Sequence, residues 1–150
     1  MGSIVFQRVL IICVGNICRS PTAEFLLRRR LPAGAGNIVS SAGLGALVGR
    51  PVEATAAEIL REQGIDCSGH QARQLTVDML RQSDLILTME KSHVAAIGRI
   101  APEVSGRVFL LGKWQSDISI PDPYGRQRPA YDHAYGLIDQ AVSSWLPYLL

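Results

Sequence analysis

The sequence predicts an α/β fold of three layers, in which helices cover both faces of a four-stranded parallel sheet. Short apolar segments rich in β-branched residues alternate with longer segments of helical periodicity along the chain. Units that alternate in this way join parallel strands through right-handed crossovers. The 150 residues, 47% of them apolar and 19% charged, match one globular domain, so residues 1–150 are expected to form a single domain.

Four segments have the composition of strands buried in such a sheet. Three are short apolar runs, and the fourth has the β-branched pair Ile38-Val39 at its centre. In chain order the four segments span residues 5–13, 37–41, 85–89 and 107–111. Open parallel sheets bind ligands beyond the carboxyl ends of their strands, so the loops after these segments are expected to meet at one site.

Five segments carry helical signals. The first is expected to begin with Ser20 as N-cap and Pro21 at the first helical position. The second is expected to end at Gly64, and Ser92 is expected to cap the fourth. The last has an apolar stripe at helical spacing. The segments span residues 20–31, 53–63, 76–82, 92–100 and 130–148, with a glycine-rich loop at 42–49 and a long loop at 112–129.

The loop after the first strand has an unusual set of side chains. It reads Cys13-Val14-Gly15-Asn16-Ile17-Cys18-Arg19-Ser20. A thiol thus opens the loop, and a guanidinium and a hydroxyl close it at the start of the first helix. The loop matches neither the G-x-G-x-x-G pattern of dinucleotide sites nor the G-x-x-x-x-G-K-[ST] pattern of nucleotide sites.

The chemistry of this loop favours an oxyanion. A loop that enters a helix points several backbone N–H groups into one concavity, and the helix dipole adds positive charge there. Arg19 supplies a planar fork for two phosphate oxygens, Gly15 allows a close turn, and Asn16 tolerates a positive φ. The same field favours the thiolate of Cys13, to which Ser20 can donate a hydrogen bond. The loop therefore predicts a phosphate site that already contains a nucleophile.

Composition and charge exclude several classes of protein. The net charge of +2 gives no strong field for nucleic acid. Three cysteines, an odd number, argue against a disulfide-stapled secreted domain, and residues 1–6 lack the features of a signal peptide. No apolar run approaches the 18 residues of a membrane span. We therefore expect a cytoplasmic protein that does not insert into membranes. His93 and His133 are expected on helix surfaces.

These motifs resemble those of the low-molecular-weight protein tyrosine phosphatases. The loop at 13–20 matches that family's C-x5-R-[ST] signature, and Ile120-Pro121-Asp122-Pro123-Tyr124 resembles its Asp-Pro-Tyr acid loop. Ser40-Ser41-Ala42-Gly43 and His70-Gln71-Ala72-Arg73-Gln74 are similar in position and type. The resemblance covers essentially all 150 residues and is closest to the Gram-negative branch linked to exopolysaccharide production. It implies strand order 2-1-3-4, and a tyrosine autokinase as the phosphotyrosine protein that is the partner.

The resemblance also implies a role for each site residue. Cys13 resembles the nucleophile, Arg19 the phosphate clamp and Asp122 the general acid, with the phosphate bound by the loop residues Val14, Gly15, Asn16, Ile17, Cys18, Arg19 and Ser20. Ser20 resembles the residue that stabilises the thiolate, and Asn16, Ser41 and His70 the network that supports the loop. The phenol ring is expected in a slot bounded by Ile17, by Tyr124, and by Leu44 or Leu47 opposite. No metal or other cofactor is implied.

Two positions depart from the animal members of this family. Gly125 stands where a second aromatic residue often follows the acid loop, and the loop at 43–49 lacks their aromatic residue. Both departures concern the substrate entrance. A reversible disulfide between Cys13 and Cys18 stays an open alternative to free thiols. The chain is expected to be a monomer or a weak dimer.

Other functions on the same fold remain as alternatives. An arsenate reductase would need further cysteines to pass on a disulfide, and residues 68–150 contain none. A protein arginine phosphatase resembles the chain closely but has threonine in place of Ile17, whose apolar side chain suits an aromatic ring. A catalytically inactive phosphate-binding module would not need Cys13 and Asp122 intact. A zinc site has no matching Cys/His pair to complement Cys13 and Cys18.

Overall fold

The computed structural model describes residues 5–150 of the chain. The prediction that the chain has no signal peptide concerns mainly residues 1–4, which lie outside the described residues. Four parallel strands form one sheet in the order β2-β1-β3-β4, which confirms the predicted fold class and strand order. The strands span β1 (Arg8–Cys13), β2 (Ile38–Gly43), β3 (Leu85–Thr88) and β4 (Val108–Leu110).

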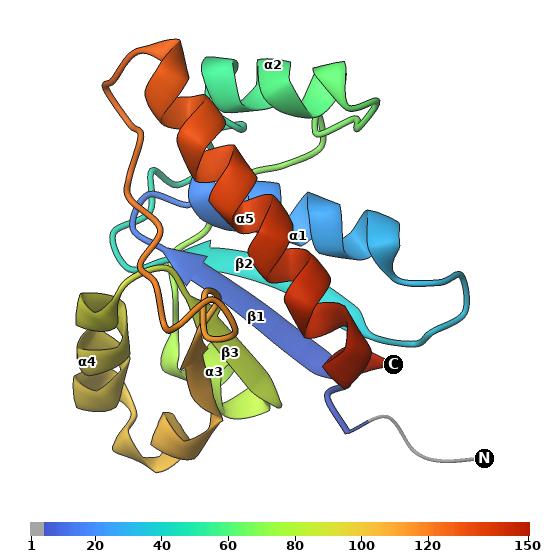
Figure 1. Ribbon diagram of the computed structural model, residues 1–150. Helices are drawn as coiled ribbons and strands as arrows, with labels where there is room; N and C mark the ends of the chain where they lie inside the picture. Colours follow the sequence, from blue (N-terminus) through green and yellow to red (C-terminus); the bar gives the residue numbers. More distant parts are fainter. Residues whose placement is uncertain (1–4) are drawn as a thin grey trace.

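Helices lie on both faces of this sheet (Figure 1). One layer contains α1 (Arg19–Arg30), α2 (Ala54–Glu62) and α5 (Arg128–Leu149). The opposite layer contains α3 (Val77–Gln82), α4 (Lys91–Ile100) and a 3₁₀ helix, η1 (Pro102–Arg107). The predicted helices are all present, whereas η1 was not predicted. A 3₁₀ helix of only six residues is too short to show an apolar periodicity from which it could be predicted.

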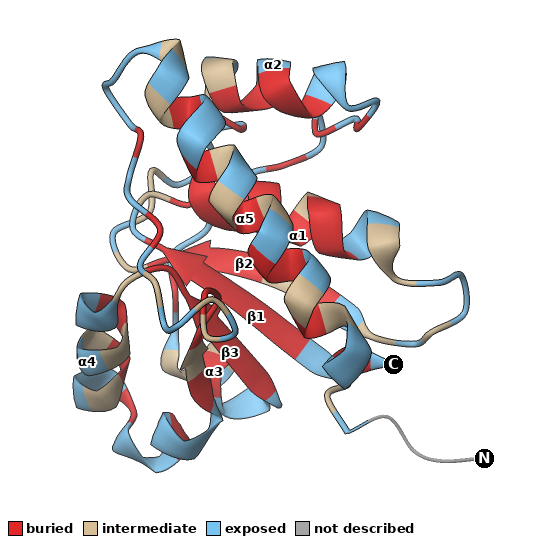
Figure 2. Ribbon diagram, in the orientation of Figure 1, coloured by how far each residue is buried: buried red, intermediate tan, exposed pale blue. Residues whose placement is uncertain are grey.

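The central strand β1 divides the core in two. Its side chains alternate, so Val9, Ile11 and Cys13 pack with α1, α2 and α5, while Leu10 and Ile12 pack with α3 and α4. All five are at most 3% exposed, and Figure 2 shows the strand buried along almost its whole length. This double burial explains why the segment reads as a continuous apolar run rather than an alternating one.

Some predicted helix ends are confirmed and others are wrong. The second helix does stop before Gly64, which adopts φ +76°. Ser20, however, is not an N-cap: α1 begins at Arg19 after Cys18, and the Ser20 hydroxyl is turned towards the preceding loop instead. Ser92 is likewise inside α4, whose N-cap is Glu90.

The expectation that His93 lies on the surface is wrong. Its side chain on α4 is 3% exposed, although His133 on α5 is exposed as expected. Burial, followed by the nearby Arg19, lowers the pKa of His93, so its imidazole is neutral in the folded protein. The helical pattern of α4 contains few large apolar residues, so nothing in the sequence marked which face this histidine occupies.

The last residue of β2, Gly43, is packed directly against the loop that follows β1. A Cβ atom on this glycine would lie 2.3 Å from the backbone oxygen of Val14. Gly43→Ala is expected to lower the free energy of unfolding by about 1–3 kcal/mol, because the backbone of the loop must move. Thermal unfolding measures this. Gly69→Ala is the matched control, since no atom lies within 4 Å of its added methyl group, and an equal loss in both variants would contradict the prediction.

Candidate active site

The loop after β1 lies at the carboxyl edge of the sheet, where the topology predicts a ligand site. Cys13 is the last residue of β1, and Arg19 begins α1 after a loop of five residues. Asn16 adopts φ 58°, a conformation that the sequence analysis allowed for. Gly15 does not have a positive φ, and a methyl group there would meet only ordinary contacts, so the backbone does not require glycine at this position.

A chain of hydrogen bonds leads from the core of the protein to the sulfur of Cys13. The Asn16 amide Nδ2 donates to the hydroxyl oxygens of Ser20, at 2.8 Å, and Ser41, at 2.9 Å. The Ser20 oxygen lies 2.9 Å from Cys13 Sγ. Since Ser20 already accepts from Asn16, its own proton is free to point to the sulfur. This direction is the one that stabilises a thiolate.

The orientation of Asn16 is fixed from three sides. Its Oδ1 accepts from the backbone N–H of Arg73 at 3.0 Å, which identifies the other amide atom as the donor nitrogen. Its backbone oxygen lies 2.7 Å from His70 Nε2, and a carbonyl can only accept, so His70 carries its proton on Nε2. Ser41 donates onward to the buried carboxylate of Glu24 at 2.5 Å. The loop is thus held by groups from α1, from β2 and from residues 70–73.

The guanidinium of Arg19 is only 2% exposed, and its buried N–H groups are bound by neighbouring oxygens. Its Nη1 donates to Glu90 Oε2 at 2.6 Å and to the backbone oxygen of Ile120 at 2.8 Å. Its Nη2 lies 3.7 Å from Asp122 Oδ2. Glu90 and Ile120 therefore bind one edge of the planar group, and its other edge is turned to the site.

A pocket of about 180 Å³ opens above the loop. Its lining brings the thiol, the guanidinium and the carboxylate of the predicted site together with an apolar wall: Cys13, Val14, Gly15, Ile17, Cys18, Arg19, Gly45, Leu47, Asp122 and Tyr124. Of the two leucines expected to face Tyr124, Leu47 lines the pocket. Leu44 does not, because it packs on the core cluster beneath α3 and α4.

The carboxylate of Asp122 is positioned by its own loop. Its Oδ1 accepts from the backbone N–H of Tyr124 at 3.1 Å, and the intervening Pro123 is buried. Prolines on both sides restrict the backbone further. The side chain remains 48% exposed, so it can exchange protons with water. Gly125, next in the loop, is exposed with φ +78°, and no side chain there narrows the entrance.

The two cysteines of the loop lie in different environments. Burial, and next the charge of Glu53, raises the pKa of the Cys18 thiol far above its ordinary value. Cys18 is therefore protonated at neutral pH, whereas Cys13 faces the Ser20 hydroxyl and the N-terminus of α1. All three cysteines are free thiols in the structure. Of the three cysteines, all of them within residues 5–150, Cys13 is the one that both contacts the Ser20 hydroxyl and lines the pocket.

Residues 8–149 match the family described as low molecular weight phosphotyrosine protein phosphatase. The chain belongs to this family. The protein from Escherichia coli named low molecular weight protein-tyrosine-phosphatase Etp is 46% identical over 145 residues, which cover 97% of this chain and 96% of Etp.

Solved structures of low-molecular-weight phosphatases share the fold. The structure of Vibrio vulnificus Wzb in complex with benzylphosphonate matches with a TM-score of 0.88 and 46% identity, covering 93% of this chain and 97% of that one. The YwlE arginine phosphatase from Geobacillus stearothermophilus matches with a TM-score of 0.84 and 30% identity, covering 91% and 88%. The chain is thus more similar in sequence to the tyrosine phosphatases among these proteins.

Three groups at this phosphatase site were missed by the sequence analysis. Glu90 binds Arg19, Glu24 binds Ser41, and the backbone N–H of Arg73 binds Asn16. Glu90 could have been found, since it directly follows the third strand at the edge where the loops were expected to meet. Glu24 and the Arg73 backbone group carried no comparable signal.

Among residues 5–150, no group of three or more His, Cys, Asp or Glu side chains is arranged to hold a metal ion. Within the same residues, no helix has both the length and the apolar composition to cross a bilayer.

The hydroxyl of Ser20 gives a direct test of the hydrogen-bond chain. Ser20→Ala is expected to slow alkylation of Cys13 by iodoacetamide at neutral pH about tenfold, because the sulfur loses a donor that favours its anionic form. Labelling followed by peptide mass spectrometry measures the rate at Cys13. Ser92→Ala, an exposed hydroxyl on α4, serves as control, and an unchanged rate in Ser20→Ala would refute the direction assigned to this bond.

Proposed function

We propose that the protein hydrolyses phosphotyrosine in proteins through a cysteinyl-phosphate intermediate on Cys13. One observation carries the proposal: a single pocket is lined by the thiol of Cys13, the guanidinium of Arg19 and the carboxylate of Asp122. These are a nucleophile, a phosphate clamp and a proton donor. Membership of a phosphatase family supports the same reaction class.

In the first step the phosphoryl group binds with its oxygens towards Arg19 and the backbone N–H groups of residues 14–20. The thiolate of Cys13 attacks phosphorus in line with the bond to the phenol oxygen. A sulfur–phosphorus bond forms while the phosphorus–oxygen bond breaks, and Asp122 gives its proton to the departing phenolate. The products are free tyrosine hydroxyl and phosphocysteine.

In the second step water attacks the same phosphorus atom. Asp122, now a carboxylate, takes a proton from this water, and the sulfur–phosphorus bond breaks. Inorganic phosphate leaves and the thiolate of Cys13 is restored, with Ser20 donating a hydrogen bond to it. The sequence of steps returns every group to its starting state without a cofactor.

The walls of the pocket favour an aromatic substrate. Ile17, Leu47 and Tyr124 supply an apolar lining above the thiol. A phenyl ring can fill such a slot, whereas the short side chain of phosphoserine would leave its peptide backbone in contact with the rim. The Vibrio vulnificus relative that binds benzylphosphonate supports this choice. The site residues proposed here are those of the sequence analysis, with Leu47 rather than Leu44.

The partner and setting are proposed from the resemblance. The substrate protein is a bacterial tyrosine autokinase that controls exopolysaccharide production, and similarity to Wzb and Etp supports this branch. The phosphatase acts in the cytoplasm as a single domain, monomeric or weakly dimeric. Arginine phosphatase activity is the second candidate, supported by the similarity to YwlE, but Ile17 favours a ring over a guanidinium.

Peptide substrates distinguish these activities. Phosphotyrosine, phosphoserine and phosphoarginine forms of one peptide are incubated with the protein in EDTA, and released phosphate is measured. We expect turnover of phosphotyrosine alone. Turnover of phosphoarginine instead would keep the nucleophile and replace the substrate, whereas no turnover of any form would favour a binding module.

A further inference from the structure

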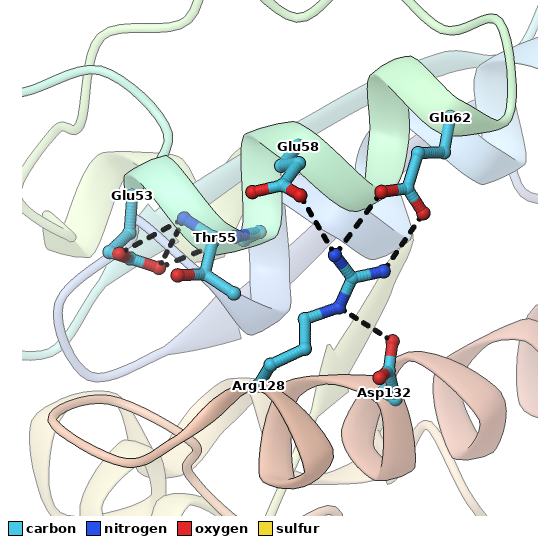
Figure 3. A network of polar contacts seen from close by, with 7 residues as sticks. Glu53, Thr55, Glu58, Glu62, Arg128 and Asp132 are labelled. Atoms are coloured by element: carbon cyan, nitrogen blue, oxygen red, sulfur yellow. Dashed lines mark hydrogen bonds and ion pairs between the residues drawn. The ribbon is translucent and has the colours of Figure 1, made fainter.

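Arg128 lies where the acid loop ends and α5 begins. It is the first residue of α5, six positions after Asp122. Figure 3 shows its guanidinium between α2 and α5, with carboxylates around it. Neither the expected catalytic groups nor the family signature includes this arginine.

The guanidinium makes contacts with three carboxylates on two helices. Its Nη1 donates to Glu58 at 3.0 Å and to Glu62 at 3.1 Å, and its Nη2 donates to Glu62 at 2.8 Å. Its Nε donates to Asp132, one turn along α5, at 3.0 Å. The contact with Glu62 is bidentate, the geometry in which arginine holds a carboxylate most firmly. We call these four residues the Arg128 clamp.

The clamp joins the acid loop to the helix that supports the phosphate loop. At the start of α2, the backbone N–H of Glu53 donates to the backbone oxygen of Ile17 at 2.8 Å. Between the helices, Pro123 of the acid loop lines a small cavity of about 10 Å³, together with Ala56 of α2 and Tyr131 of α5. Pro123 is thus seated where α2 and α5 meet, one residue from Asp122.

The cavity at this junction holds no more than about one water molecule, and apolar residues of both helices pack around it in one core cluster. Alanines supply part of its lining on both helices, Ala56 on α2 and Ala134 on α5. The clamp adds polar contacts between α2 and α5 to this apolar packing, so we expect it to help set the spacing of the two helices around Pro123. A change of about 1 Å in the position of an acid is enough to reduce proton transfer strongly.

The clamp is exposed enough for salt to weaken it. The side chains of Arg128, Glu58, Glu62 and Asp132 are 38% to 56% exposed. The hydrogen bond from Arg128 lowers the pKa of Glu62 below its ordinary value of 4.5. Glu62 is therefore ionised at and above that pH, and this part of the clamp is lost only as the pH falls through the lowered value.

We propose that Arg128 is a positioning residue for the acid Asp122, because the clamp holds α2 and α5 around Pro123. Ionic strength, which weakens the clamp, thereby changes how efficiently Asp122 delivers its proton. This inference rests on the proposed function. The groups that hold Cys13 and Arg19, namely Ser20, Glu90 and the backbone oxygen of Ile120, lie outside the clamp. Its loss affects the step in which a poor leaving group needs a proton, and leaves phosphate affinity unchanged.

Leaving-group dependence tests the proposal. In Arg128→Ala, kcat/KM for phenyl phosphate is expected to fall about three- to fivefold, the upper scale of exposed ion pairs. The fall for p-nitrophenyl phosphate, which needs less protonation, is expected to stay within about twofold, with an unchanged inhibition constant for inorganic phosphate. Glu62→Gln is expected to change the ratio of the two substrates in the same direction.

Salt provides a second readout with an internal standard. Raising KCl from about 20 mM to about 500 mM is expected to move the substrate ratio of the wild type towards that of Arg128→Ala, because the Debye length shrinks. The ratio of Arg128→Ala itself is expected to stay constant. Amide hydrogen exchange at 121–127 is expected to be faster in Arg128→Ala than in the wild type.

Arg81→Ala is the matched control, because Arg81 forms an exposed ion pair with Glu103 at 2.8 Å between α3 and η1. Arg81→Ala is expected to behave as the wild type in its substrate ratio, in its inhibition by phosphate, in its salt dependence and in hydrogen exchange. A substrate ratio in Arg128→Ala equal to that of Arg81→Ala would overturn the proposal, as would an equal loss on both substrates accompanied by weaker phosphate binding. A wild type without Cys13-dependent turnover of either substrate would instead remove the proposed function, and with it this role of Arg128.

Discussion

Replacing Cys13 by serine is expected to reduce the turnover of phosphotyrosine peptides by at least about 10⁴-fold, the scale of losses when a nucleophile is removed. A serine hydroxyl in the same place is a far weaker nucleophile, because a hydroxyl is much less acidic than a thiol and stays protonated at neutral pH. Oxyanion binding is expected to persist, because Arg19 and the loop backbone are unchanged. Steady-state kinetics and calorimetric titration with tungstate measure the two effects separately.

Cys67→Ser is the control for this variant. Cys67 is also a buried thiol, 5% exposed, but it does not line the pocket. Its replacement is expected to leave turnover within about twofold of the wild type. Retained turnover in Cys13→Ser, or loss of tungstate binding together with turnover, would show that the thiol is not the nucleophile or that the loop has collapsed.

Replacing Asp122 by alanine is expected to lower kcat/KM for phenyl phosphate by about 10²–10⁴-fold, the usual contribution of a positioned general acid. The loss for p-nitrophenyl phosphate is expected to be much smaller, because that leaving group departs as an anion more readily. A slope of rate against leaving-group pKa measures this, and it is expected to be steeper in the variant.

Asp78→Ala, which removes an exposed carboxylate at the start of α3, is expected to leave the slope unchanged. A uniform loss on all leaving groups in Asp122→Ala would assign Asp122 a structural role in place of proton transfer. Such a structural role would rest on the hydrogen bond that Asp122 accepts from the backbone N–H of Tyr124.

Much of the fold followed from the sequence because its signals are local. The apolar run of β1 and the stripe of α5 each reflect burial against neighbours on a regular period, and Gly64 marks a helix end by its left-handed backbone. The N-terminus of α1 did not follow. Ser20 and Pro21 gave a normal start signal, but the Ser20 hydroxyl serves the sulfur of Cys13 instead of a cap.

The site was predictable where one short segment carries it and not where distant segments meet. The loop at 13–20 was proposed as a phosphate site from its own residues, and Asp122 was proposed as the acid from the resemblance of its segment to the family's acid loop. The roles of Glu90 and Arg128 depend on partners 71 and 66 to 70 residues away, which no periodicity relates. The sequence left Leu44 and Leu47 as alternatives for a similar reason, since an irregular loop has no fixed alternation of inward and outward side chains.

The measurement that tests the central claim most directly is the capture of the covalent intermediate. The protein is mixed with a phosphotyrosine peptide, quenched within milliseconds, digested and analysed by mass spectrometry, with Cys13→Ser in parallel. We predict phosphate on the peptide that contains Cys13 in the wild type and none in the variant. Turnover of the peptide with phosphate on another residue, or turnover that persists in Cys13→Ser, would contradict the mechanism derived from this pocket.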